Sequence, residues 1–137
     1  MRKNIKITYN SLISNNFIHY DRQQEYLLNE VDIVWKNNKK INFFSKSKKY
    51  YGVYVCGSVG IGKTFIINLF IESVKRSKKI HFNHLMINLH AFMNNNKTER
   101  ALDIFVKNLA NKYSVLFIDE LHIFNIVDAL LVKKMFT

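Results

Sequence analysis

Proline is absent from the 137-residue sequence, and glycine and cysteine are scarce, with four copies and one copy. The single cysteine, Cys56, excludes a disulfide within the chain, and its place at the end of an apolar segment predicts a small buried side chain rather than a reactive thiol. The sequence also lacks an apolar run of membrane-spanning length and a continuous hydrophobic stretch near its N-terminus. We therefore expect neither a transmembrane segment nor secretion, and a cytoplasmic protein for which peripheral membrane association stays open.

Acidic residues are few as well. Asp and Glu number 10 against 21 Lys and Arg, which gives a formal net charge of +11. Such a charge favours an anionic partner such as nucleic acid or a membrane surface. The lysines are scattered rather than gathered on one helix face, however, and their abundance fits an A+T-rich coding sequence. Nucleic acid is thus an alternative partner that we do not favour, and the densest basic run, residues 36–49, is interpreted as a solvated linker that could also steer an anionic nucleotide.

Residues 57–64, Gly-Ser-Val-Gly-Ile-Gly-Lys-Thr, match the phosphate-binding pattern G-x-x-x-x-G-K-S/T without a mismatch. Such a loop surrounds a β-phosphate with backbone N–H donors, in a conformation that glycine adopts at little cost. Lys63 carries a positive charge toward the β- and γ-phosphates, Thr64 offers a hydroxyl to Mg²⁺, and the following helix directs its positive dipole end at the anion. The predicted ligands are ATP and Mg²⁺. The predicted nucleotide-binding residues are Gly57, Ser58, Val59, Gly60, Ile61, Gly62, Lys63 and Thr64.

The segments on either side of this loop have the required order. Residues 51–56 are rich in β-branched and aromatic side chains, which predicts a buried strand. Residues 64–76 are mostly apolar and predict a largely buried helix. A strand, a glycine-rich loop and a helix in this order are what the phosphate site needs.

Two helices are expected upstream of the loop. Residues 5–15 predict a short helix. Asp21 and Gln24 then resemble a capping box before apolar residues at helical spacing, so a second helix is expected to run to about residue 37. We assign this helix to packing. A role for Asp21 or Gln24 beside the nucleotide is the alternative, which no chemistry in the sequence supports.

Downstream of the loop helix, residues 80–82 are short enough for a second strand, and residues 85–93 predict a helix that ends at a polar turn of three asparagines. Thr98 is the expected cap of a further helix. The spacing of three histidines in this region matches no compact metal site, so metal ligation is the less favoured interpretation. These histidines are His81, His84 and His90.

A second chemical signal begins at residue 115. The apolar residues 115–118 predict a buried strand, and Asp119 and Glu120 follow at its C-terminal tip, where open α/β sheets bind ligands. Asp119 is suited to hold Mg²⁺ through water, and Glu120 to polarise a water for attack on the γ-phosphate. Because neighbouring strand residues point to opposite faces, the two carboxylates can take different roles. We predict Glu120 and Lys63 as catalytic residues and Thr64 and Asp119 as metal ligands.

Three segments together resemble the ZapE cell-division ATPase family, whose mitochondrial relatives are the AFG-type ATPases. The segments are residues 51–64, 80–90 and 119–130. The family motif, which begins with the acidic pair, reads roughly D-E-F-x-V-x-D-I-A-D-A-M. This chain departs from it with Leu121 in place of Phe and Asn125 in place of Asp. It keeps Asp119, Glu120, Ile126, Asp128 and Ala129.

The resemblance implies an AAA+-type P-loop ATPase, an α/β protein of three layers with a parallel sheet and N-terminal helices, that hydrolyses ATP to ADP and phosphate. It divides the chain into an N-terminal helical region with a basic linker, residues 1–50, and a partial ATPase core, residues 51–137. Bacterial members are associated with the division ring and mitochondrial members with inner-membrane protein quality control. The implied partners are therefore proteins, among them the cell-division ring, in the bacterial cytoplasm or alternatively in the mitochondrion.

Family members continue through another strand, an arginine finger, a fifth strand and further helices. All four arginines of this sequence precede Asp119, and loss of an arginine finger can lower turnover by about 10³- to 10⁵-fold. We therefore expect a truncated member that lacks the C-terminal strands and binds nucleotide more securely than it hydrolyses it. The function that we predict is that of an ATPase of the ZapE type. The alternatives are a nucleotide-binding remnant without turnover and a helicase-loader-like AAA+ protein that binds DNA through its charge.

Overall fold

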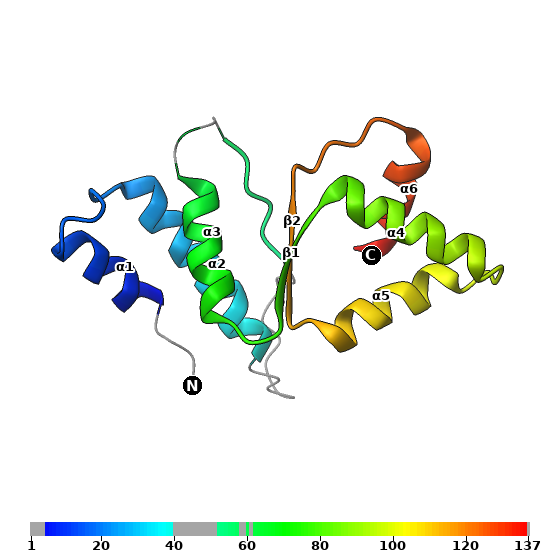
Figure 1. Ribbon diagram of the computed structural model, residues 1–137, viewed down its shortest axis with the longest axis horizontal. Helices are drawn as coiled ribbons and strands as arrows, with labels where there is room; N and C mark the ends of the chain where they lie inside the picture. The colour runs from blue at the N-terminus through cyan, green and yellow to red at the C-terminus, as the bar shows by residue number, and fades with distance from the viewer. Residues whose placement is uncertain (1–4, 40–51, 58–59, 61, 137) are drawn as a thin grey trace. The chain divides into compact units, whose positions relative to one another are not determined.

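The computed structural model describes residues 5–39, 52–57, 60 and 62–136 (Figure 1). Its elements are α1 (Ile5–Ser14), α2 (Arg22–Lys39), α3 (Lys63–Ser73), β1 (Ser77–His81), α4 (Phe82–Asn95), α5 (Ala101–Lys112), β2 (Val115–Asp119) and α6 (Ile126–Met135). The chain forms two compact units, residues 1–73 and residues 74–137. The boundary expected between residues 50 and 51 falls outside the described residues and stays a prediction. No helix in the described ranges combines the length and apolarity that crossing a bilayer requires.

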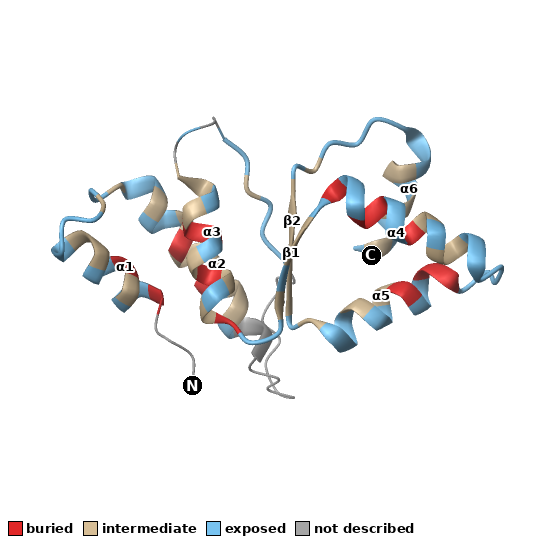
Figure 2. Cartoon of the chain, in the orientation of Figure 1, coloured by how far each residue is buried: buried red, intermediate tan, exposed pale blue. Residues whose placement is uncertain are grey.

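The first unit is built from three helices whose apolar faces meet. Helix α3 contacts both α1 and α2, and the buried residues of these helices are coloured red in Figure 2. They include Ile5 and Tyr9 of α1, Leu28 of α2, and Ile66 and Phe70 of α3. The helix predicted over residues 5–15 is confirmed, and the loop helix predicted from residue 64 begins one residue earlier.

Helix α2 starts where the sequence predicts. The Asp21 carboxylate accepts hydrogen bonds from the backbone N–H groups of Gln23 (2.7 Å) and Gln24 (3.2 Å), which makes Asp21 the N-cap. The backbone N–H of Asp21 donates to the hydroxyl of Tyr9 at 3.4 Å. The start of α2 is therefore tied to α1 as well as capped.

The second unit is organised on a parallel pair of strands. Strands β1 and β2 align from Ser77 opposite Val115 to His81 opposite Asp119. The chain turns into α4 directly after β1, so the strand predicted over residues 80–82 is displaced toward the N-terminus. The core against the strands comes from α4 and α5. Its buried residues are Phe82, Leu85, Met86, Leu89, Leu102 and Phe105.

The turn before β1 is tied to the end of α5. Arg76 donates from Nε to the carbonyl oxygen of Lys112 at 3.1 Å, and its guanidinium also contacts the carbonyl of Asn111. The N–H of Ser114 donates to the carbonyl of Arg76 at 2.7 Å. The two contacts of the Arg76 guanidinium satisfy carbonyl groups in the last turn of α5, which have no partners within the helix.

The strand predicted before the phosphate loop is not formed. Tyr51 lies outside the described residues, and residues 52–57 have no regular secondary structure. Among the described residues the sheet contains two strands, β1 and β2, and a strand forms only when a neighbour shares its ladder of hydrogen bonds. Cys56 is exposed as a consequence, so the prediction of a buried cysteine was wrong. The parallel strands and the helices beside them agree with the predicted α/β class. The sheet has two strands among the described residues.

The prediction that Thr98 caps a helix was also wrong. Helix α5 begins at Ala101 with Arg100 at the N-cap position, and no side chain caps it. The backbone of Thr98 takes part in the preceding turn, where its N–H donates to Asn96 at 2.8 Å and its carbonyl accepts from Ala101 at 3.1 Å. Local turn bonds therefore displace the helix start by two residues.

Candidate functional site

The phosphate-binding motif ends at the start of α3. Ser58, Val59 and Ile61 lie outside the described residues. Gly57, Gly60 and Gly62 have φ angles of 147°, 94° and 76°. Such angles are open to glycine and unfavourable for residues with a Cβ. The three described glycines therefore adopt backbone angles that a tight phosphate-binding loop uses and other residues rarely reach.

Lys63 is the first residue of α3, and its ammonium group contacts Gly57, the first residue of the motif. Its Nζ donates to the carbonyl oxygen of Gly57 at 2.7 Å. Thr64 follows on the helix and is exposed. The positive charge and the positive end of the α3 dipole thus lie at the same end of the helix, a combination that favours an anion.

Helix α2 also reaches the loop. A Cβ built on Gly62 would lie 2.5 Å from Nε2 of Gln24, which is far inside a normal contact distance. The hydroxyl of Tyr9 donates toward Oε1 of the same amide at 3.4 Å. The sequence offered no chemical reason to place Gln24 beside the loop, because the contact joins two elements through tertiary packing.

Asp119 is the last residue of β2, and its carboxylate is ionised. Its Oδ2 lies 2.9 Å from Nζ of Lys79, with both side chains partly buried. The hydrogen bond from Lys79 holds the pKa of Asp119 below its ordinary value, against the opposing effect of burial, and the charge of Lys79 and the N–H of Glu120 add to the lowering. An ionised carboxylate is the form that binds Mg²⁺.

Glu120 is the first residue beyond β2, and its backbone is strained. Its φ is 52°, a left-handed value that is uncommon for a residue with a Cβ. Its N–H donates to Oδ1 of Asp119 at 3.1 Å, and its Oε2 lies 3.9 Å from Nδ1 of His81. The expectation that the two carboxylates alternate as strand neighbours was wrong, because β2 ends at Asp119. Strain of this kind often accompanies functional residues.

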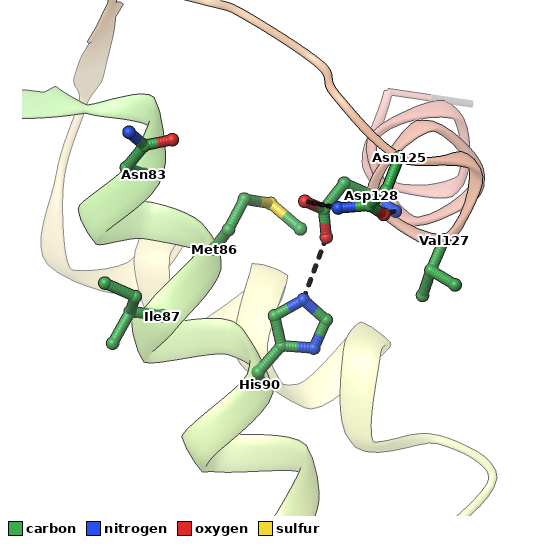
Figure 3. Close-up of a pocket in the computed structure, with 7 residues that line it drawn as sticks. All are labelled: Asn83, Met86, Ile87, His90, Asn125, Val127 and Asp128. Atoms are coloured by element: carbon green, nitrogen blue, oxygen red, sulfur yellow. Dashed lines mark hydrogen bonds and ion pairs between the residues drawn. The ribbon is translucent and has the colours of Figure 1, made fainter.

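A pocket of about 590 Å³ lies beside the start of α6 in the second unit (Figure 3). Nε2 of His90 on α4 lies 2.9 Å from Oδ1 of Asp128 on α6. Asn125 caps α6, because its Oδ1 accepts from the N–H of Asp128 at 2.8 Å and its Nδ2 donates to Oδ2 of Asp128 at 2.7 Å. The other lining residues are Asn83, Met86, Ile87 and Val127. Asn and Asp both serve well as N-caps, so the departure from the family motif at Asn125 preserves this function.

A magnesium ion that arrives with a nucleotide needs few ligands from the protein. Within the described ranges, no three or more His, Cys, Asp or Glu side chains are grouped to hold a metal ion by themselves. Magnesium bound to a nucleotide takes only one or two ligands from the protein, with oxygen preferred. The hydroxyl of Thr64 is such an oxygen in the first unit, and the ionised carboxylate of Asp119 is one in the second.

Comparison with known proteins identifies relatives over most of the chain. The family model of AFG1-like ATPases matches residues 7–137. An uncharacterized protein of Schizosaccharomyces pombe is 32% identical over 94 residues, or 62% of this chain and 21% of that protein. Lactation elevated protein 1 homolog B of Danio rerio is 30% identical over 108 residues, or 67% of this chain and 21% of that protein.

A bacterial relative matches a similar share. The cell division protein ZapE of Escherichia coli K12 is 32% identical over 84 residues, or 58% of this chain and 22% of that protein. The chain thus spans about a fifth of the length of these curated relatives. No solved structure matches the chain.

Proposed function

Because the chain belongs to the AFG1-like ATPase family, we propose that it binds Mg·ATP at residues 57–64 and hydrolyses it to ADP and phosphate. The observation that carries the proposal is the arrangement at the start of α3. Gly62, with a positive φ, leads directly into a helix whose first residue, Lys63, bonds through its ammonium group to the carbonyl of Gly57. This is the chemistry that a polyphosphate needs: backbone donors, a cation and a helix N-terminus.

Each side chain has a distinct role in this proposal. Lys63 neutralises charge on the β- and γ-phosphates. Thr64 would hold the magnesium ion by its hydroxyl, and Asp119 would hold it through water. When bound, the ion neutralises charge that develops on the phosphate oxygens. Glu120 accepts a proton from the attacking water at its carboxylate. Its exposure, 69% of the side chain, leaves room for that water.

The family also suggests a cellular setting. One relative is named a cell division protein in a bacterium, and others come from eukaryotes. We extend this to a cytoplasmic protein that acts on protein partners, including the cell-division ring, with a mitochondrial location as the alternative. Association with a membrane, where it occurs, would be peripheral.

The decisive experiment is a titration with Mg·ATP followed by an assay of phosphate release. Wild type should bind saturably, and Lys63→Ala should bind at least about 30-fold more weakly because a cation facing the phosphates is lost. Lys75→Ala, at an exposed lysine outside the motif, is the control and should stay within about 2-fold of wild type. Glu120→Gln should bind ATP normally and lose turnover.

Two results would contradict parts of this proposal. Absence of saturable binding, or binding equal in wild type and Lys63→Ala, would reject the nucleotide site. Tight binding with the nucleotide left intact would reject hydrolysis and retain a nucleotide-binding protein.

A further inference from the structure

We propose that Gln24 of α2 is part of the nucleotide site and that its side-chain amide donates a hydrogen bond to a phosphate group of the bound nucleotide. This inference rests on the proposed function. It starts from the contact between Nε2 of Gln24 and Gly62, where a Cβ would lie only 2.5 Å from the amide nitrogen. Gly62 immediately precedes Lys63, so the amide lies at the part of the loop where the motif receives the β- and γ-phosphates.

The amide of Gln24 has its oxygen toward Tyr9 and its nitrogen toward Gly62. Tyr9 is 2% exposed, so its position is fixed by packing. Its hydroxyl donates toward Oε1 of Gln24 at 3.4 Å, which places the amide oxygen on the Tyr9 side. The NH₂ group, with its two donors, is then the end beside Gly62.

The backbone of Gln24 is held as well. Its N–H donates to the Asp21 carboxylate at 3.2 Å, as part of the N-cap of α2. The hydroxyl of Tyr9 lies 3.4 Å from both the N–H and the carbonyl oxygen of Asp21. Asp21 and Tyr9 are thus positioning residues, since they act on a ligand through Gln24.

The chemistry of the amide favours phosphate as its partner. An N–H that donates to an anionic oxygen makes a stronger hydrogen bond than one that donates to a neutral acceptor. A neutral amide supplies this donor without adding charge beside the Lys63 ammonium. A carboxylate at the same position would offer no donor and would repel the phosphates.

The test compares two neighbouring glutamines on α2. Gln24→Leu removes the donor and Gln24→Glu replaces it with a negative charge at almost unchanged size. Gln23→Leu and Gln23→Glu are the matched controls, because Gln23 is exposed and its backbone bonds to the same Asp21 carboxylate. The probes are Mg·ATP and inorganic tripolyphosphate, which has the phosphates without base or ribose. Circular dichroism of each variant reports whether its helices are retained.

Gln24→Leu should bind both probes about 10-fold more weakly, the value of one hydrogen bond to a charged group. Gln24→Glu should lose more, and both Gln23 variants should stay within about 2-fold of wild type. Tyr9→Phe keeps the buried ring and removes the orienting hydroxyl, so it should weaken both probes by a smaller factor. This third variant tests the inference even where a substitution at Gln24 disturbs α2.

Three results would overturn the inference. Gln24 variants that bind like their Gln23 counterparts would show that the amide only packs against the loop. A loss for Mg·ATP with unchanged tripolyphosphate binding would place Gln24 at the base or ribose and reject the phosphate contact. A wild-type chain that binds neither probe would reject the nucleotide site itself, and this inference with it.

Discussion

Glu120, the proposed catalytic base, has an unfavourable backbone conformation. At a φ of 52°, a residue with a Cβ costs roughly 1 kcal/mol more than glycine. The neighbouring interactions that keep this conformation are the N–H bond to Asp119 and the proximity of His81. For stability alone, glycine would be the better residue at this position. The presence of glutamate therefore fits a functional requirement.

We therefore expect Glu120→Gly to be more stable than Glu120→Ala by about 1 kcal/mol, since glycine alone relieves the strain. The measurement is amide hydrogen exchange of β2, which reports opening of the second unit. The same pair of substitutions at His122, whose φ is not positive, should give the opposite order. Equal stability of the two Glu120 variants would show that the backbone angle carries no strain.

The ion pair of Lys79 with Asp119 gives a second prediction at the residue scale. The pKa of Asp119 is lowered in the folded state, mainly by the hydrogen bond from Lys79. A carboxyl of this kind stabilises the fold fully above its ordinary value of 3.8 and loses that contribution as the pH falls through the lowered pKa. Lys79→Met should therefore be less stable than wild type at pH 7, with the difference shrinking as the pH falls below 3.8.

The measurement has two parts. Carbon NMR of the Asp119 carboxyl should show a higher pKa in Lys79→Met than in wild type, and urea unfolding across the same pH range should show the converging stabilities. Lys78→Met, at the exposed neighbour, is the control and should leave both unchanged. A stability difference that stays constant down to acidic pH would assign the effect of Lys79 to its cation–π contact with Phe117 instead, since its Nζ lies 5.6 Å from the centroid of that ring.

Helix α6 depends on a few contacts at its first turn. No residue of α6 is buried, although Leu131, Val132 and Met135 pack at the margin of the core. Its start is held by the Asn125 cap and by the bond of Asp128 to His90. Short helices are marginal without such support, so these contacts determine whether α6 persists.

Asn125→Ala should destabilise α6 by about 1 kcal/mol through loss of the cap. His90→Ala should have an effect of the same sign, because it removes the bond from α4. Hydrogen exchange of residues 126–135 should accelerate in both variants while exchange in the core of α4 stays slow. Asn88→Ala, at an exposed position of α4, serves as control. Unchanged exchange in α6 would mean that its apolar contacts alone maintain it.

The accuracy of the sequence predictions depends on whether an element is determined locally. The start of α2 was predicted from Asp21, and α4 and β2 from apolar spacing, because caps and periodicity act within a few residues. Residues 52–56 were predicted as a strand from composition, but a strand also needs a neighbour in its ladder, which no local pattern supplies. The start of α5 depends on backbone bonds of Thr98 in the preceding turn, which replace the predicted cap.

The same distinction applies to the candidate site. The motif residues followed from spacing, since the phosphate loop is one continuous segment. Gln24 beside the loop and Lys79 beside Asp119 come from other elements, and packing and strand register brought them into place. Register could in principle have indicated Lys79, because it lies two residues before His81, the strand partner of Asp119, and therefore on the same face of the pair.

At the scale of the whole molecule, the distribution of charge bears on whether the protein binds nucleic acid. Residues 1–73 hold 11 Lys or Arg against 5 Asp or Glu, and residues 74–137 hold 10 against 5. The excess is therefore divided almost equally between the two units. A protein that tracks nucleic acid usually gathers its cations on one face or helix. Here both units carry an excess, which we attribute to a general background of positive charge.

This division predicts weak binding to single-stranded DNA that does not depend on ATP. Nonspecific contacts between cationic side chains and DNA phosphates weaken as the salt concentration rises. A protein that neutralises roughly 6 to 10 phosphates loses about 10³- to 10⁵-fold in affinity between roughly 50 and 200 mM salt. The measurement is fluorescence anisotropy of a labelled mixed-sequence strand across that range, with and without Mg·ATP. Lys63→Ala is the control and should leave DNA binding unchanged while removing nucleotide binding. Saturable binding that survives high salt and strengthens with Mg·ATP would instead support a helicase-loader-like protein, because nucleotide and DNA would then be coupled.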